Sequence, residues 1–492
     1  MTSTPDAKAI LDFLGKRVTL STSSTPQLAG QMDKAAGTKE RERKKAFQKK
    51  QKEGETKPGD TYEPLRRKPG LRALPDRELG GPVRVTLWDV LHHLARAFGL
   101  SQRGASRGLA EHWGSLKYCQ ALGSGAGKQL MLSEEGRRIA AHYKALQSEE
   151  LGHAFALAIS EQILTRRYPD HSVSFIRADT ALRSGWSLTS GDKSKSKAKT
   201  VGYSYRPHFL AEVWKPGESS RVFPIVSKGN HSDRKKVYEQ LASAAVHADG
   251  LHIGAWNETP ALIFATEIPL DKPLTIHALH ADGPGGWLRI PEGTPASDIG
   301  LPIGDRNPPI GITIPGQGGI SDTSVPGCQV GPEYHAWFQR ALARVGAAGL
   351  TAFAGDGEST AALLTQRQGS DFFQGFAHAA AGSVQDVSYK LRGELFEGTD
   401  HVFRLNGQRI QAFSGVATDL LDVLVTRERD KRQADIAAYR QRVHDRRAKP
   451  HGTFPDQEWG GLISISRDGT VLAMRRIAAF KDDRAPSVAA RP

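Results

Sequence analysis

The sequence predicts a mixed α/β protein of the α+β type with several domains. Its 492 residues exceed the roughly 250–300 residues at which a single hydrophobic core stops growing. The hydrophobic share of 38%, together with 51 glycines, is typical of a globular chain. From Val83 onward, segments with helical periodicity alternate with short β-type runs. These three observations exclude wholesale disorder and indicate helices and sheets in one chain.

Residues 1–80 are expected to form a disordered basic region. They contain a short apolar stretch, a Ser/Thr-rich stretch, the basic run KERERKKAFQKKQKEGETK at 39–57, and then Pro- and Arg-rich sequence. Such a composition buries too little apolar surface to offset the entropy of ordering. We therefore expect a chain that begins near Pro82 to fold as well as the full chain.

A helical module is expected over residues 83–145, because Leu87, Val90, Leu91 and Leu94 recur at the spacing of an amphipathic helix. A second helical pattern at 133–168 opens the next region. After it, the patterns predict strands at 172–182, 208–214 and 221–229, a helix at 233–248, and strands at 261–268 and 274–280. KPGESS separates the second and third strands and is typical of a turn, so these two strands are expected to form a hairpin.

The C-terminal part divides at a Gly- and Pro-rich connection, residues 281–331. The following region, 332–482, is expected to be α+β, with helices first and then strands. Asn406-Gly407 and Asp468-Gly469 each lie between alternating apolar residues, which predicts two β-hairpins. Between the hairpins, residues 416–447 are expected to form one charged, solvated helix.

The chain carries a formal net charge of +14, and its pI is near 9.6. The basic run at 39–57 accounts for +5 of this charge, so most of the excess lies elsewhere. A strongly basic balance favours a polyanionic partner, and nucleic acid is the usual one.

Other classes of protein fit the sequence poorly. It has no apolar run of the ~18 residues that a transmembrane helix needs, so no membrane partner is expected. The N-terminus lacks the pattern of a secretory signal, and the two cysteines, Cys119 and Cys328, offer neither a disulfide framework nor a zinc spacing. These features predict a cytoplasmic protein.

The segment 146–280 resembles the core of the PD-(D/E)xK, or restriction-endonuclease-like, nuclease superfamily. The resemblance lies in the order αβββαβ, in Lys228-Gly229 at the end of the hairpin, in Pro207 before it, and in Gln240 on the next helix. In that superfamily an acid before the first hairpin strand and an acid two residues before the lysine hold Mg²⁺, which activates water. A glutamate on the preceding helix often completes the site; Glu149 and Glu150 both stand at the start of that helix here, and Glu150 is the candidate. The resemblance thus implies a catalytic set of Lys228, Gln240 and Glu150.

This chain departs from the motif at both metal-binding positions. His208 stands where the first acid is expected, and Val226 stands where the second is expected. Magnesium binds weakly without carboxylates. If the site were active, other acids would have to serve as ligands, and the candidates are Glu150, Asp179 and Glu212. The expected cofactor is therefore none, or Mg²⁺ if the site is active as a metal-dependent deoxyribonuclease.

Lysine and arginine side chains near the predicted hairpin provide a second type of site. They can contact phosphate oxygens regardless of base sequence. The candidate nucleic-acid-binding residues are Lys193, Lys195, Lys197, Lys199, Arg234, Lys235 and Lys236.

Three hypotheses follow. The first is a nucleic-acid-binding protein, for DNA, with a restriction-endonuclease-like core that has lost its metal carboxylates. The resemblance implies a role in DNA defence, restriction or repair, together with a protein partner. The second is an active Mg²⁺-dependent DNA endonuclease with a rearranged site. The third is a non-catalytic structural or assembly scaffold.

Overall fold

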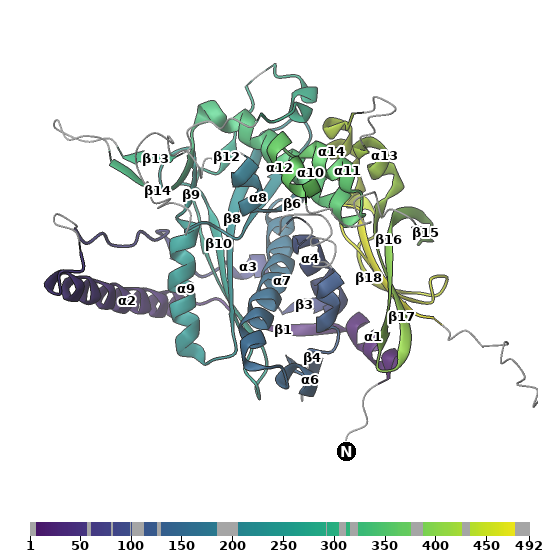
Figure 1. The fold of residues 1–492 in the computed structure, drawn as a ribbon, viewed down its shortest axis with the longest axis horizontal. Coiled ribbons are helices and arrows are strands. Elements are labelled where there is room, and N and C mark those ends of the chain that lie inside the picture. The colour runs from purple at the N-terminus through teal and green to yellow at the C-terminus, as the bar shows by residue number, and fades with distance from the viewer. Residues whose placement is uncertain are drawn as a thin grey trace, which may run out of the picture.

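The computed structural model describes residues 6–56, 61–79, 82–98, 100, 113–124, 129–184, 205–291, 293–304, 311–314, 323–374, 387–425 and 433–477. Two β-sheets stand side by side with helices between them, and further helices cover the outer face of the larger sheet (Figure 1). The chain is therefore mixed α/β with several sheets, as the sequence predicted.

The larger sheet is built from strands of the N-terminal half. Its strands are β1 (Arg17–Ser23), β2 (Leu71–Arg72), β3 (Val83–Thr86), β6 (Ser172–Arg177), β7 (Phe209–Trp214), β8 (Ser220–Asn230), β10 (Ala261–Glu267), β11 (Thr275–Ala281) and β12 (Trp287–Leu288). The order along the sheet is β3-β1-β11-β10-β8-β7-β6, with β2 paired to β11 and β12 paired to β8. β6, β7 and β8 are antiparallel neighbours, whereas β8 and β10 are parallel.

The middle segment runs α7 (Ala141–Arg167), β6, β7, β8, α9 (Arg234–Ala248) and β10, which is the predicted order. One prediction within it is wrong. The strand expected at 172–182 ends at Arg177, and α8 (Ala178–Ser184) follows it. Ala181 and Leu182 are fully buried on this short helix, so tertiary packing overrides the local β-type pattern.

Helices cover both faces of the larger sheet. α9 packs on one face through Val237 and Leu241, and α2 (Pro26–Lys52) packs on α9 in turn. α7 covers the opposite face and approaches β8 closely at two glycines. A side chain on Gly229 would overlap the Ser148 carbonyl oxygen, so only glycine allows this approach.

The expectation that residues 1–80 are disordered does not match the structure. α1 (Ala7–Gly15), β1 and α2 follow one another, and β1 lies inside the larger sheet between β3 and β11. Leu14, Val18 and Leu20 are almost completely buried. Val18 and Leu20 alternate with polar residues as a strand requires, a signal too short to change the average composition of the region. Truncation near Pro82 would therefore remove part of the core.

The second sheet contains the predicted hairpins. Its strands are β15 (Val387–Leu391), β16 (Glu394–Leu405), β17 (Gln408–Ala417), β18 (Gly452–Asp456), β19 (Gly461–Ile465) and β20 (Thr470–Arg476), in the order β15-β16-β17-β20-β19-β18. Asn406 and Gly407 have φ of 47° and 81°, as a two-residue turn between β16 and β17 requires. Asp468 and Gly469 lie in the turn between β19 and β20. Both hairpins are thus confirmed.

The single charged helix expected at 416–447 is instead two short helices among the described residues. They are α13 (Thr418–Leu424) and α14 (Ile436–Asp445); residues 426–432 lie outside the described part. Leu420, Leu421 and Leu424 are buried on α13, and Ile436 and Tyr439 are buried on α14. Both helices therefore pack against the protein through one apolar face and are not surrounded by solvent.

The Gly- and Pro-rich connection contributes to the core. Its elements are η3 (Ala296–Gly300), β13 (Gly311–Ile314) and β14 (Thr323–Val330), in addition to β12. β14 pairs in parallel with β9 (Leu251–Ile253), so the end of the connection joins a small separate sheet.

The helices between the two sheets include α4 (Leu87–Phe98), α7 and α10 (His335–Phe353), and one apolar cluster continues from sheet to sheet through them. The remaining elements are α3 (Asp76–Leu79), η1 (Ser115–Tyr118), β4 (Leu122–Ser124), β5 (Leu130–Leu132), α6 (Glu134–Arg137), η4 (Pro332–Tyr334), α11 (Gly357–Leu363), α12 (Gln366–Gln374) and η7 (Arg446–Ala448). Among the helices that the structure describes, none has both the length and the apolar character needed to cross a membrane.

Candidate nucleic-acid interface

The hairpin of β7 and β8 is closed at one end and open at the other. Its turn end is at Lys215–Glu218, where Gly217 has φ of 73°. At the other end β7 starts at Phe209, opposite Ile225, whereas β8 continues to Asn230. This extension of β8 pairs with β10 alone among the described strands. The side of β8 that faces β7 is therefore open to side chains from the flanking helices.

Three histidines fill this opening. His208 precedes β7, His153 comes from α7, and His247 comes from α9. The ring centroids of His153 and His208 are 4.8 Å apart, and those of His208 and His247 are 5.9 Å apart. The Ser227 N–H donates to His208 Nδ1 at 3.1 Å, so the other ring nitrogen, Nε2, carries the proton of the neutral ring. We call these three residues the histidine cluster.

Electrostatics keep the histidine cluster neutral. Burial lowers the pKa of His153 to about 3, and the charges of Arg177 and Lys228 act in the same direction. Burial also lowers the pKa of His208 well below its usual value, assisted by His153, Lys228, His247 and Arg177. The pKa of His247 is lowered too, first by burial and then by Lys228. At neutral pH the cluster thus consists of uncharged imidazoles beside a lysine.

Lys228 is half-buried at this end of β8. Burial lowers the pKa of its ammonium group, and the charge of Glu149 acts against this shift. Within the described residues, the Lys228 ammonium group makes no hydrogen bond or ion pair. A half-buried cation of this kind has hydrogen-bonding capacity left for an anion.

Gln240 lies close to Lys228, and its hydrogen bonds have a structural role. Its Nε2 donates to the Gly229 carbonyl oxygen at 2.9 Å, and the Asn230 Nδ2 donates to its Oε1 at 2.6 Å. The side chain therefore joins α9 to the end of β8. It holds the Gly229 carbonyl group and the Asn230 side chain, directly after Lys228.

The helical acid near Lys228 is Glu149, whereas the sequence pointed to Glu150. Glu149 influences the pKa of Lys228, and its carboxylate lies 3.9 Å from His153 Nε2. Glu150 accepts a hydrogen bond from the Tyr118 hydroxyl and lies 2.7 Å from Lys117 Nζ. Successive residues of a helix point about 100° apart, so only one of two adjacent glutamates can face the site.

The other two candidate acids are paired with arginines elsewhere. Asp179 lies on α8 and accepts a hydrogen bond from Arg206 Nη2 at 2.8 Å. Glu212 is fully buried and accepts two hydrogen bonds from Arg440, at 3.0 and 3.1 Å. It pairs with Val222, toward the turn end of the hairpin and away from Lys228.

The residues at the open end do not fit magnesium. Val226 is fully buried and packs toward α9, and the Nδ1 of His208 already accepts a backbone hydrogen bond. Across the described part of the chain, no group of three or more His, Cys, Asp or Glu side chains is arranged to hold a metal ion. Magnesium requires several oxygen ligands, and Glu149 supplies the carboxylate nearest to Lys228.

The predicted phosphate-binding residues fall into two groups. Arg234, Lys235 and Lys236 are exposed in the first turn of α9, directly after the end of β8. The Asp233 side chain caps this helix by accepting from the Lys236 N–H. Lys193, Lys195, Lys197 and Lys199 lie outside the described residues.

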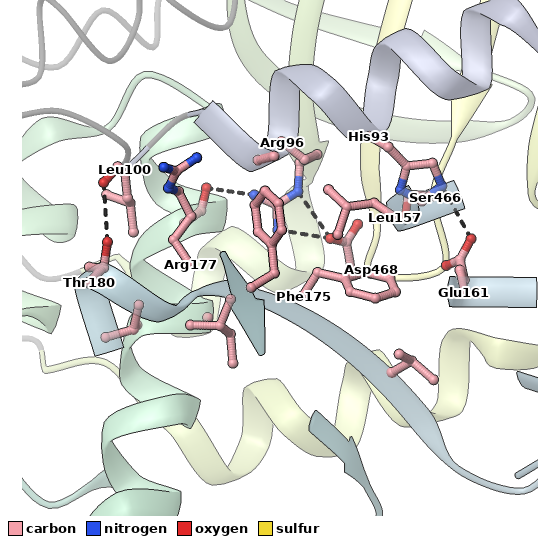
Figure 2. Close-up of a pocket in the computed structure, with 17 residues that line it drawn as sticks. His93, Arg96, Leu100, Leu157, Glu161, Phe175, Arg177, Thr180, Ser466 and Asp468 are labelled. Atoms are coloured by element: carbon pink, nitrogen blue, oxygen red, sulfur yellow. Dashed lines mark hydrogen bonds and ion pairs between the residues drawn. The ribbon is translucent and has the colours of Figure 1, made fainter. Parts of the chain in front are cut away.

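Arg177 connects this region to a small cavity of about 60 Å³ between β6, α4, α7 and α10 (Figure 2). Two ion pairs line the cavity: His93 with Glu161 at 3.4 Å, and Arg96 with Asp468 at 2.9 Å. The guanidinium of Arg177 lies over the Phe209 ring at 5.4 Å. At the ~10–15 Å³ of such space that one water needs, the cavity has room for a few waters and not for a nucleotide.

Sequence reasoning missed the roles of His153, His247 and Arg177. One local signal was present, because Glu149 and His153 are four residues apart on a helix and therefore share a face. The convergence of α7, α9 and the hairpin on one point depends on tertiary structure.

No protein-family model, curated protein or solved structure matches this chain.

Proposed function

We propose that this chain binds nucleic acid, and specifically DNA, through a restriction-endonuclease-like core that does not cut it. One observation carries the proposal. Lys228 and three neutral histidines meet at the open end of β7–β8, where the resemblance would place the metal-binding carboxylates.

The order of elements supports the relation to that superfamily. α7, β6, β7, β8, α9 and β10 occur in the order of the αβββαβ core, with the short α8 added after β6 and the short β9 added after α9, and Lys228 stands near the end of the second hairpin strand. Gln240 on α9 contacts the backbone next to this lysine. The proposal therefore has two parts, an inherited framework and an altered site.

The altered site suits a phosphate better than a metal. Phosphate oxygens accept hydrogen bonds from an ammonium group and from an imidazole N–H such as that of His208 Nε2, whereas His247 already donates its Nδ1–H to the Arg206 carbonyl oxygen. Arg234, Lys235 and Lys236 add exposed positive charge next to the end of β8. Such contacts bind the backbone of DNA regardless of its sequence and weaken as salt rises. A role in DNA defence, restriction or repair, with a protein partner, follows from the resemblance alone.

An active Mg²⁺-dependent endonuclease is the second candidate, and Glu149 is the observation that favours it. This carboxylate acts on Lys228, as a metal-binding acid in such a site would. A single carboxylate is a weak magnesium site, so we place this candidate after DNA binding.

A direct test incubates the purified protein with supercoiled and linear DNA, in Mg²⁺, in Mn²⁺ and in chelator, and measures both cutting and binding. We expect no cutting, and binding that is weakened in Lys228→Ala. Lys390→Ala is the matched control, because Lys390 is exposed and lies on β15 of the second sheet. Metal-dependent cutting that is lost in Lys228→Ala would instead establish the endonuclease. If the protein neither cuts nor binds DNA, the hypothesis of a structural scaffold would be favoured.

A further inference from the structure

The helix α2 has two unlike halves. Its first half is held by apolar packing, because Leu28, Met32 and Ala36 are buried against α9. None of its described residues from Gly37 to Lys52 is buried. In Figure 1 this half projects sideways from α9, away from both sheets.

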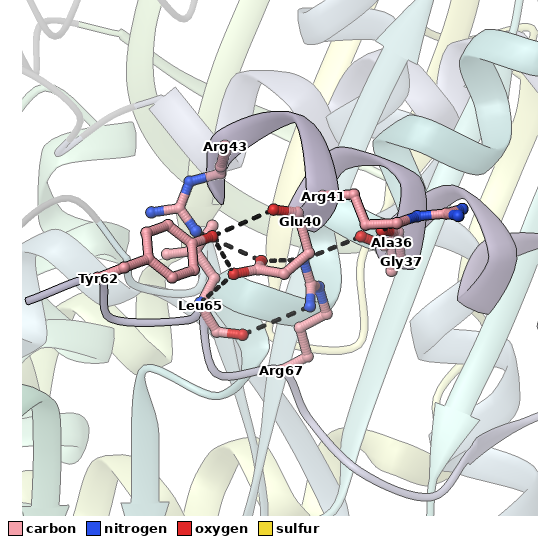
Figure 3. A network of polar contacts seen from close by, with 8 residues as sticks. All are labelled: Ala36, Gly37, Glu40, Arg41, Arg43, Tyr62, Leu65 and Arg67. Atoms are coloured by element: carbon pink, nitrogen blue, oxygen red, sulfur yellow. Dashed lines mark hydrogen bonds and ion pairs between the residues drawn. The ribbon is translucent and has the colours of Figure 1, made fainter. Parts of the chain in front are cut away.

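The projecting half is nevertheless fixed in place. Figure 3 shows the Glu40 carboxylate at the centre of a polar network with the returning chain. The Tyr62 hydroxyl, the Leu65 N–H and Arg67 Nη2 all donate to this carboxylate, the last two at 3.3 and 3.0 Å. Burial alone would raise the pKa of Glu40, but the hydrogen bonds from Tyr62 and Arg67 lower it.

Aromatic contacts extend this support along the helix. The Phe47 and Tyr62 rings are 5.7 Å apart, and the Arg43 guanidinium lies over Tyr62 at 5.8 Å. The returning chain thus holds a helix that would otherwise extend alone into solvent.

The projecting half carries a dense positive charge. Its cations are Lys39, Arg41, Arg43, Lys44, Lys45, Lys49, Lys50 and Lys52, against two acids, Glu40 and Glu42. Like charges four residues apart, such as Arg41 and Lys45, destabilise a helix. Lys44, Lys45, Lys50 and Lys52 are exposed, and within the described residues their ammonium groups make no hydrogen bond or ion pair. A polyanionic partner would offset this repulsion.

The charged surface continues from α2 to the candidate interface. The Lys39 and Lys236 ammonium groups both contact Glu239, at 3.5 and 3.1 Å. The next residue, Gln240, contacts the backbone beside Lys228. Residues 39–52 extend over ~21 Å at 1.5 Å per residue, and duplex DNA carries one phosphate charge per ~1.7 Å of its axis. An extended row of phosphates is therefore the complementary surface.

We propose that residues 39–52 of α2 form an arm that binds the phosphate backbone of duplex DNA. The arm extends the interface of Lys228 and the first turn of α9, and this inference rests on the proposed function. A membrane surface fits less well, because helices that lie in a membrane expose several large apolar side chains. Phe47 is the one large apolar residue of this segment, and it packs on Tyr62.

The test compares two charge-matched variants of the full chain. The arm variant carries Lys44→Gln, Lys45→Gln, Lys50→Gln and Lys52→Gln. The control variant loses the same charge from exposed positions on other surfaces: Lys8→Gln, Lys16→Gln, Lys390→Gln and Arg476→Gln. Fluorescence anisotropy of a labelled duplex gives Kd between about 50 and 200 mM salt. Circular dichroism checks that each variant keeps its helices.

The arm variant should bind at least about tenfold more weakly at the lower salt, with a log–log salt slope shallower by up to ~3.6, or ~0.9 per phosphate contact. The control should remain close to wild type. If wild type binds DNA and both variants bind equally well, the arm is refuted while the proposed function stands. If the wild-type protein does not bind DNA, the arm and the proposed DNA-binding function are both refuted. A loss of binding to anionic vesicles by the arm variant, with DNA binding intact, would also refute the arm.

Discussion

The two ends of the β7–β8 hairpin differ in whether their buried charge has a partner of opposite sign. Toward the turn, Glu212 and Arg440 form a fully buried, doubly hydrogen-bonded ion pair, and Arg440 also lies 3.9 Å from the centre of the Trp214 ring. At the open end, Lys228 has no ion pair within the described residues, and its neighbours are uncharged histidines. A completed pair indicates a structural role, whereas a half-buried cation beside uncharged side chains indicates a site for an anion.

The turn end should give the largest effect on stability. Glu212→Ala leaves Arg440 buried without its partner, so the free energy of unfolding should fall by about 3–5 kcal/mol. Urea unfolding measures the change. Glu149→Ala is the control, because Glu149 is exposed, and it should cost less than about 1 kcal/mol. If both variants lost a similar free energy of unfolding, the buried ion pair at the turn end would not have the structural role assigned to it.

Acid should weaken the fold through the histidine cluster. The pKa of His153 is about 3 in the folded chain, against ~6.5 in the unfolded chain. Between these values the unfolded chain binds more protons, so stability should decrease as pH falls below about 6.5. Thermal melting at stepwise lower pH tests this. A His153→Gln variant should show a smaller loss, and an unchanged pH dependence would place His153 in a more open environment.

Lys228 should matter more for binding than for stability. Lys228→Met removes a half-buried charge without creating an unpaired one, so the melting temperature should change little or rise. Affinity for DNA should fall roughly tenfold, and the salt slope should decrease by about one phosphate contact. Lys390→Met is the control, because Lys390 is exposed on the second sheet. If wild type and Lys228→Met bound DNA with equal affinity, the DNA-binding surface would not include the open end of the hairpin.

Glu149 should give the smallest effect, with the opposite sign. Its charge lies near Lys228 and repels phosphate, so Glu149→Gln should raise DNA affinity by a few-fold at low salt. Glu150→Gln is the control, because Glu150 is paired with Lys117 and Tyr118. Weaker binding of Glu149→Gln in the presence of Mg²⁺ would instead indicate a metal-assisted contact.

Local sequence patterns were sufficient for part of the fold. The Asn406-Gly407 and Asp468-Gly469 hairpins and the αβββαβ order of α7 to β10 were predicted, because each depends on neighbouring residues. The burial of β1 was not predicted, since two alternating apolar residues, Val18 and Leu20, are a weak signal until a sheet exists beside them.

The candidate site shows the same limit. Lys228 and Gln240 were found from the resemblance, and the structure places them next to each other at the end of β8. The pairing of Glu212 with Arg440 joins residues 228 positions apart, which no local pattern reveals. The choice of Glu149 over Glu150 depends on how α7 is rotated against β8, and that rotation is fixed by the Gly152–Gly229 approach.

The most direct test of the central claim is the affinity of the full chain for duplex DNA in chelator and in Mg²⁺, at matched ionic strength. The account predicts that Mg²⁺ does not raise the affinity, that binding weakens as salt rises in both conditions, and that the DNA is intact after incubation. Binding or cleavage that requires Mg²⁺ would contradict it, because the open end of β7–β8 would then hold a metal ion.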